Sequence, residues 1–275
     1  RLKSQRLSKA KRPTEAHEAA RRAVELDPEN PVAHAYLAEA FHASGQLVEA
    51  EAAYLEALDL APFDAVFHLN FGTLQRDLGQ QGPAEQSFRR ALELRPDWAL
   101  PYRNLGELEA ERRDFVQASA AFQKAKELDP RDAIAHWRLG DMALKLRQFD
   151  AAEQAYRDAL EVAPGDHEAW FGLGETHRLR HRSAEAEADY RKAIELQPDY
   201  AAAHTALGIV FHDRSQVDEA ERFYRQAIAL NPARSAPYNN LGNLYREARG
   251  NPDEAEKWYR QALELCPDGA EARNG

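Results

Sequence analysis

The chain has 275 residues, with 36 Lys and Arg against 46 Asp and Glu, and carries a formal net charge of −10. Its 44% hydrophobic residues suffice for a buried core, which excludes a disordered chain, and its acidic balance argues against a nucleic-acid partner. The single cysteine, Cys266, excludes a disulfide framework and a Cys-rich zinc module. No apolar run is long enough for membrane insertion, so we expect a cytoplasmic protein.

Proline recurs along the whole chain with a fixed spacing. Successive prolines of this series lie 34 residues apart six times and then 35 residues apart, and each follows an apolar residue two positions earlier. The series consists of Pro28, Pro62, Pro96, Pro130, Pro164, Pro198, Pro232 and Pro267. Such a period indicates a repeat protein in which each unit stacks on its neighbours, because one unit cannot bury its own apolar faces.

The period divides the chain into consecutive units. Residues 1–30 are predicted to form a partial N-terminal repeat, residues 31–269 seven complete units, and residues 270–275 the start of a further, truncated repeat. The seven units are predicted at residues 31–64, 65–98, 99–132, 133–166, 167–200, 201–234 and 235–269.

Each unit contains two stretches with helical spacing of small and large residues. In the unit 99–132, Gly106 lies in the first stretch, and Ala118, Phe122 and Ala125 lie in the second. A glycine inside a helix costs about 1 kcal/mol relative to alanine, so its recurrence indicates a close approach of two helices. We therefore predict a helix hairpin in each unit, ended by the recurring proline.

These residues resemble the tetratricopeptide repeat (TPR). The unit 167–200 carries the fullest set of matching positions, which are Trp170, Leu173, Gly174, Ala186, Tyr190, Ala193 and Pro198. The resemblance implies an all-α, right-handed superhelical solenoid of stacked helix-turn-helix units, in which the first helix of each unit lines a concave face. It also implies a protein or peptide partner.

Both ends of the chain lack a polar capping helix, so we expect the parent protein to be longer. Self-association through the uncapped terminal repeats is one alternative that this leaves open. The first twelve residues contain six Lys and Arg and no acidic residue, and we interpret them as part of a broken helix or a linker rather than a nucleic-acid contact.

No catalytic or cofactor-binding signature is present in the sequence. It lacks a phosphate-binding Gly-rich loop, a Gly-x-Ser-x-Gly elbow and a His-Glu-x-x-His motif. His177 and His181 are four residues apart on one predicted helix, but no third metal ligand is evident nearby. We expect no enzymatic activity, no cofactor and no metal in this chain.

The resemblance assigns six positions of each unit to the concave face: the second, fifth, sixth, ninth, twelfth and thirteenth. Asparagine at the sixth position can pair with any peptide backbone, because its amide both donates and accepts, and an aromatic residue beside a carboxylate can anchor an apolar or basic side chain. The alternative for Trp137 is burial next to His136. The candidate peptide-binding residues are Asn70, Arg103, Asn104, Trp137, Arg138, Asp141, Phe171, Glu175, Asn239 and Asn240.

Two functional hypotheses remain open. The first is a protein–protein interaction scaffold that binds an extended peptide segment along the concave groove. The second is the substrate-recognition arm of a larger enzyme, because residues 238–244 resemble the asparagine-bearing repeats of O-linked N-acetylglucosamine transferases, although that asparagine ladder is interrupted at Arg138, Gly172 and Ala206. A clamp for a terminal carboxylate is rejected, since only Asn104 and Arg138 match the family's clamp residues.

Overall fold

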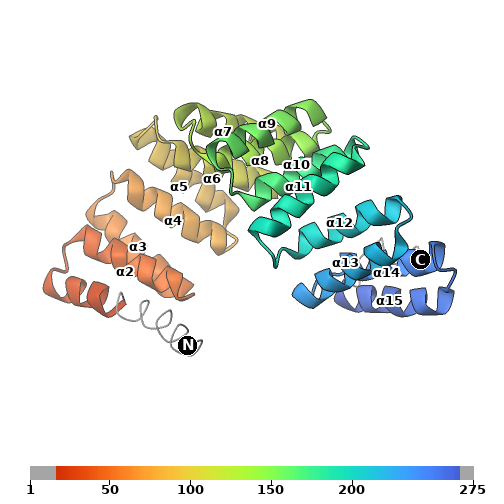
Figure 1. Cartoon of the computed structure of the whole chain (residues 1–275). Helices are drawn as coiled ribbons and strands as arrows, with labels where there is room; N and C mark the ends of the chain where they lie inside the picture. The colour runs from red at the N-terminus through yellow and green to blue at the C-terminus, as the bar shows by residue number, and fades with distance from the viewer. Residues whose placement is uncertain (1–16, 267–275) are drawn as a thin grey trace. The chain divides into compact units, whose positions relative to one another are not determined.

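The computed structural model describes residues 17–266, and this part of the chain contains helices and no strand. Residues 17–26 are helical, and each helix that follows is labelled in Figure 1. These helices are α2 (Pro31–Ala43), α3 (Leu47–Leu60), α4 (Ala65–Asp77), α5 (Gln81–Leu94), α6 (Ala99–Glu111), α7 (Phe115–Leu128), α8 (Ala133–Lys145), α9 (Phe149–Val162), α10 (His167–Leu179), α11 (Ser183–Leu196), α12 (Ala201–Asp213), α13 (Val217–Leu230), α14 (Ala236–Glu247) and α15 (Pro252–Leu265).

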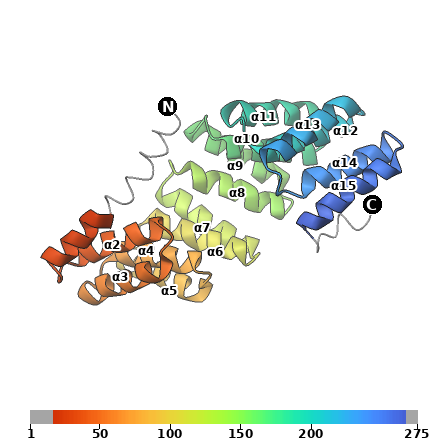
Figure 2. The ribbon, with the colours of Figure 1, turned by 90° about the horizontal axis from the view of Figure 1, so that it is seen from below.

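The chain divides into two compact units, residues 1–130 and residues 131–275. Within each unit, every odd-numbered helix packs against the even-numbered helix before it, as the two views in Figures 1 and 2 both show. The predicted all-α fold of helix hairpins is confirmed. The predicted partial repeat at residues 1–30 lies partly outside the described residues. The basic first twelve residues and the truncated repeat at 270–275 lie wholly outside them. The boundaries of the repeats stay a prediction.

The start of each first helix follows from the residues around the recurring proline. Asp129, which precedes Pro130, is extended at φ −132° and ψ 89°, as expected before a proline, and α7 ends there. Two residues after the proline, the side chain of Asp132 accepts hydrogen bonds from the backbone N–H groups of Ile134 and Ala135 and so caps α8. Asn30, Asp64 and Asp166 cap their helices in the same way.

The turn inside each hairpin requires a left-handed backbone at one residue. Gly45 and Gly79 provide it at φ +78° and +75° in the first unit, where a glycine meets no steric penalty. The equivalent residues of the later hairpins include Arg147 and His181, which hold φ +58° and +59° despite their side chains. The geometry of the turn is therefore imposed by the packing of the two helices, and not by glycine alone.

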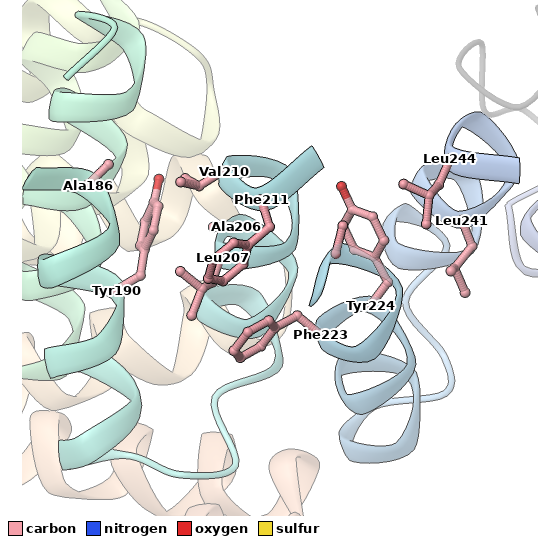
Figure 3. Close-up of a cluster of buried hydrophobic side chains, with 11 residues drawn as sticks. Ala186, Tyr190, Ala206, Leu207, Val210, Phe211, Phe223, Tyr224, Leu241 and Leu244 are labelled. Carbon is pink, nitrogen blue, oxygen red and sulfur yellow. The ribbon is translucent and has the colours of Figure 1, made fainter. Parts of the chain in front are cut away.

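The recurring glycine makes room for the recurring aromatic ring. A Cβ atom on Gly106 would lie 2.7 Å from Cε1 of Phe122, and one on Gly140 would lie 2.7 Å from Cε1 of Tyr156. Both rings are completely buried, and burial of such a side chain contributes about 1.5–3 kcal/mol. The same holds for Gly208 and Tyr224, whose ring lies in one buried cluster with Leu241 and Leu244 of the next hairpin (Figure 3).

Candidate functional site

We call the inner face of a hairpin the side of its first helix that carries the second, fifth, sixth, ninth, twelfth and thirteenth residues of the repeat. In the first unit this face has a polar hollow of about 320 Å³ at α2, α3 and α4, lined by Glu39, His42, Ala43, Tyr54, Asn70 and Thr73. Asn70 donates from Nδ2 to a carboxylate oxygen of Glu39 at 2.8 Å. Burial raises the pKa of Glu39, and this hydrogen bond opposes the shift.

Asn104 repeats this arrangement one hairpin later. Its Nδ2 donates to the hydroxyl of Thr73 at 3.4 Å, so that each asparagine bonds the ninth residue of the preceding hairpin. Within the part of the chain that the structure describes, the amide oxygens of Asn70 and Asn104 accept no hydrogen bond. Arg103 lies half-buried beside Asn104. The inner face of the first unit therefore offers amide oxygens that could accept from a peptide N–H group.

The inner face of the second unit is built differently, from an aromatic ring, an arginine and a carboxylate on α8. The guanidinium of Arg138 lies over the ring of Trp137, 4.3 Å from its centroid, and donates to Asp141 at 3.4 Å. The hydroxyl of Tyr156, a residue of α9, donates to the other oxygen of Asp141 at 2.7 Å. Burial raises the pKa of Asp141, and these two donors oppose the shift.

The same constellation recurs on α10. Arg178 donates from two nitrogens to Glu175, at 3.2 and 2.7 Å, and the hydroxyl of Tyr190 donates to the same carboxylate. The hydrogen bond to Glu175 raises the pKa of Arg178, so the arginine stays charged. Phe171, half-buried, lies between the rings of Tyr190 and Tyr200, with centroids 5.7 and 5.2 Å away. The structure thus joins the predicted pair Phe171 and Glu175 into one cluster.

The asparagine residues of α14 are less exposed to solvent than expected. Asn239 is 9% exposed, and its Oδ1 has no hydrogen-bond partner among the described residues. Asn240 is half-buried. Asn239 therefore presents little of its side chain to a ligand in this conformation.

The structure shows how two of the three interruptions of the asparagine ladder are packed. At the sixth position of α10, a Cβ on Gly172 would lie 2.2 Å from Cε1 of Tyr156, so no side chain fits there. At the same position of α12, Ala206 is 4% exposed and belongs to the buried cluster in Figure 3. Close packing against Tyr156 thus excludes asparagine from the first of these sites, and Ala206 is buried at the second.

Sequence reasoning missed the two tyrosines that complete these clusters. Tyr156 and Tyr190 were assigned only to the core, because the recurring aromatic is buried in every hairpin. The sequence gives no clear signal for them, because the ninth residue is also a carboxylate in the hairpin of Phe122, where it is Glu107, and is Ile209 in the hairpin of Tyr224. Arg178, at the twelfth position, was also missed.

The histidines at the fourth position of the repeats have a structural role. The Nε2 atoms of His34, His68 and His204 donate to the backbone oxygens of Pro28, Pro62 and Pro198, at 2.8, 2.9 and 3.0 Å. The indole of Trp170 donates to Pro164 in the same way. No group of three or more His, Cys, Asp or Glu with metal-binding geometry occurs among residues 17–266.

Family models place the repeats in a known class. A model described as tetratricopeptide repeat matches residues 2–65, 103–146, 138–201, 180–235 and 205–270, and a second with the same description matches residues 65–97. The chain belongs to the tetratricopeptide repeat family. A comparison with curated protein sequences gives no match.

Solved structures of TPR proteins share the fold. A chain of the APC/C hetero-tetramer Cut9-Hcn1 superposes with a TM-score of 0.75 at 17% identity, over 95% of this chain and 51% of that one, so this chain spans about half its length. A TPR protein from Parabacteroides merdae ATCC 43184 gives 0.72 at 18% identity, over 94% and 97%. YrrB, described as a TPR protein with an unusual peptide-binding site, gives 0.50 at 22% identity, over 68% and 96%.

The TPR fold is consistent with a protein–protein interaction scaffold, since proteins of this family bind protein or peptide partners and are generally not catalytic. In the described part of the chain, no TPR helix has the length and apolar character that crossing a membrane requires.

Proposed function

We propose that this TPR chain is a scaffold that binds an extended peptide segment of another protein along the inner faces of its first helices. The observation that carries this proposal is the paired arrangement of the second unit. Trp137 and Phe171 lie five residues into successive first helices, and each helix also carries an arginine bonded to a carboxylate that accepts from a tyrosine hydroxyl.

Such an arrangement favours binding because the side chains are already ordered. Arg138 is held by Asp141 and the Trp137 ring, and Arg178 by two hydrogen bonds to Glu175. Side chains that are already ordered lose less conformational entropy when a ligand binds to them. YrrB, whose description names a peptide-binding site, supports peptide binding as a function of this fold.

The structure refines the expected roles of the carboxylates. Asp141 and Glu175 already accept hydrogen bonds from an arginine and a tyrosine each, which compensates their negative charge. We therefore assign them to positioning Arg138 and Arg178, and we expect the ligand to place an apolar side chain on Trp137 or Phe171 rather than a basic group on the carboxylates.

The inner face of the first unit, taken by itself, would bind a peptide backbone. The amide oxygens of Asn70 and Asn104 can accept from peptide N–H groups of any sequence, while their Nδ2 atoms stay bonded to Glu39 and Thr73. Arg103, beside Asn104, and Asn239 and Asn240, on α14, remain proposed contacts.

Selection of peptides from a random phage-displayed library on the immobilised chain tests the proposal. Affinities of the selected peptides would be measured for Trp137→Ala, Phe171→Ala and the control Phe63→Ala, which removes a 74% exposed aromatic residue between α3 and α4. We expect each inner-face variant to lose about tenfold or more, as for a central aromatic anchor, and the control to lose nothing. Unchanged affinity in both inner-face variants would contradict the proposal.

A further inference from the structure

Two positions of the repeat, the eleventh residue of the first helix and the facing residue of the second, form a matched pair in several hairpins. In the first unit, the hydroxyl of Ser87 donates to Oε1 of Gln75 at 2.6 Å. In the hairpin of α10 and α11, Nδ1 of His177 lies 2.6 Å from Oδ2 of Asp189. In the next hairpin the pair is Phe211 and Phe223, with parallel rings 5.3 Å apart (Figure 3).

This pair lies at the groove between successive second helices. In the hairpin of α12 and α13 the two phenylalanine rings are buried, at 5% and 8% exposed. In the hairpin of α10 and α11 the pair His177 and Asp189 lines a hollow of about 510 Å³ between α9 and α11, floored by α10. This hollow lies on the side of α10 that carries His177, not on its inner face. Its lining consists of Arg157, Leu160, Glu161, Trp170, Leu173, His177, Glu185, Ala188 and Asp189.

The charges around the hollow are unbalanced. Three carboxylates, on Glu161, Glu185 and Asp189, face one guanidinium, on Arg157, which forms an ion pair with Glu153. Within residues 17–266, Glu161 and Glu185 are exposed and form no ion pair. Asp189 is 7% exposed and has a hydrogen bond on only one of its two oxygens.

The apolar part of the lining is complementary to a side chain with a hydrocarbon stem. Leu160, Leu173 and Ala188 supply aliphatic surface, and Trp170 supplies an aromatic ring whose Nε1 is fixed by its 2.9 Å hydrogen bond to the backbone oxygen of Pro164. An aromatic ring attracts a planar guanidinium, and carboxylates bind it with two parallel hydrogen bonds.

We propose that the hollow between α9 and α11 is a second binding site, which takes an arginine side chain presented by a partner protein. The stem would lie on Leu160 and Leu173, and the guanidinium would contact Trp170 and the carboxylates of Glu161 and Glu185. This site is separate from the inner face, so the inference does not depend on the function proposed above.

The raised pKa of Asp189 agrees with this assignment. Burial raises the pKa of Asp189 to about 6. The hydrogen bond and charge of His177 and the charge of Arg157 oppose this rise, whereas the charge of Glu185 adds to it. A guanidinium bound between these carboxylates would lower the pKa of Asp189 again. Binding would therefore strengthen as the pH rises through this range.

The test uses N-acetyl-arginine amide as the probe, titrated into the ¹⁵N-labelled chain while the indole N–H signal of Trp170 is followed by NMR. The signal is assigned with Trp170→His, which copies His204 of the next hairpin. We expect a saturable shift with the arginine amide and none with N-acetyl-citrulline amide, which has the same shape without the charge. Equal binding of both, or no saturable shift, would overturn the proposal.

Two variants locate the site. The double change His177→Phe and Asp189→Phe copies Phe211 and Phe223, fills the hollow and should abolish the shift, with helicity checked by circular dichroism. Glu185→Gln should weaken binding about two- to fivefold, the effect of losing one exposed ion pair, whereas its counterpart in the next hairpin, Glu219→Gln, should have no effect. If Glu185→Gln and Glu219→Gln bind the probe equally, the arginine site is not this hollow.

Discussion

The two units use the same helix hairpin to build inner faces of different chemistry. In the first unit the ninth residue of each inner face is held by an amide, with Asn70 bonded to Glu39 and Asn104 to Thr73, and farther along the face Asp77 lies 2.9 Å from His42 and 3.7 Å from Arg76. In the second unit it is held by ion pairs, Arg138 with Asp141 and Arg178 with Glu175. The core pair of the hairpin differs likewise, being Gln75 with Ser87 in the first unit and His177 with Asp189 in the second.

The identity of one buried aromatic residue accounts for much of this difference. Phe88 and Phe122 bury their rings completely and have no hydrogen-bonding group. Tyr156 and Tyr190 place the same ring in the same position, and their hydroxyls reach the carboxylates of the inner face. A carboxylate that accepts this hydrogen bond is fixed in place and can orient an arginine beside it. The lesson is that a core substitution can determine the chemistry of a surface.

The largest expected effect on stability comes from exchanging the residues at the sixth position of the repeat, glycine in the second unit and asparagine in the first. Gly172→Asn should destabilise the second unit by about 3 kcal/mol, because a Cβ there would lie 2.2 Å from the Tyr156 ring. The reciprocal Asn70→Gly should cost less, about 1–2 kcal/mol, from the lower helix propensity of glycine and the lost hydrogen bond to Glu39. Denaturant unfolding followed by circular dichroism measures both. Gly165→Asn, at a turn with no atom within 4 Å of the added Cβ, is the control, and an equal loss in that variant would refute the steric explanation.

Removing an aromatic ring from the inner face should have the next largest effect. Trp137 is half-buried and packs beside Tyr156 and Leu173, so Trp137→Ala should lower stability by about 2 kcal/mol and also free the guanidinium of Arg138. Thermal unfolding and peptide affinity would be measured on the same sample. A loss of stability with unchanged affinity would show that Trp137 serves only the core.

A matched pair of tyrosine substitutions tests the role assigned to the hydroxyl groups. Tyr156→Phe removes a hydrogen bond to a carboxylate and should cost about 1–2 kcal/mol. Tyr54 is equally buried, but its hydroxyl makes no hydrogen bond to the described residues, so Tyr54→Phe should change stability by less than about 0.5 kcal/mol. Denaturation midpoints would compare the two, and similar values would remove the distinction between the units.

The last predicted effect, which is confined to a narrow pH range, is a pH dependence of stability due to the pair His177 and Asp189 in the second unit. Because the pKa of Asp189 is raised from 3.8 to about 6, the folded chain binds more protons than the unfolded chain between these values, and stability falls as the pH rises through them. Asp189→Asn should therefore become more stable relative to the parent chain, on the order of 1–2 kcal/mol, between pH 4 and pH 6. Ser87→Ala, in the uncharged pair, should give a difference from the parent that does not vary with pH.

The sequence by itself was enough to establish the helix hairpins and their stacking. Each of those features depends on a single residue type with a strong local effect: a proline that ends a helix, and a glycine opposite an aromatic ring. Such effects act within one repeat and recur with it, so the spacing of the residues displays them directly.

The tertiary structure decided which groups of the inner face are available to a ligand. Asp141 is engaged by Tyr156, fifteen residues away, and Glu39 by Asn70, thirty-one residues away, and nothing near either carboxylate in the sequence predicts its partner. The same holds for Gly172, whose position is closed by a ring from the preceding hairpin, and for the hollow lined by His177 and Asp189. Hydrogen bonds and close packing act only over a few ångströms, so they depend on the contacts between hairpins, which the repeat pattern does not specify.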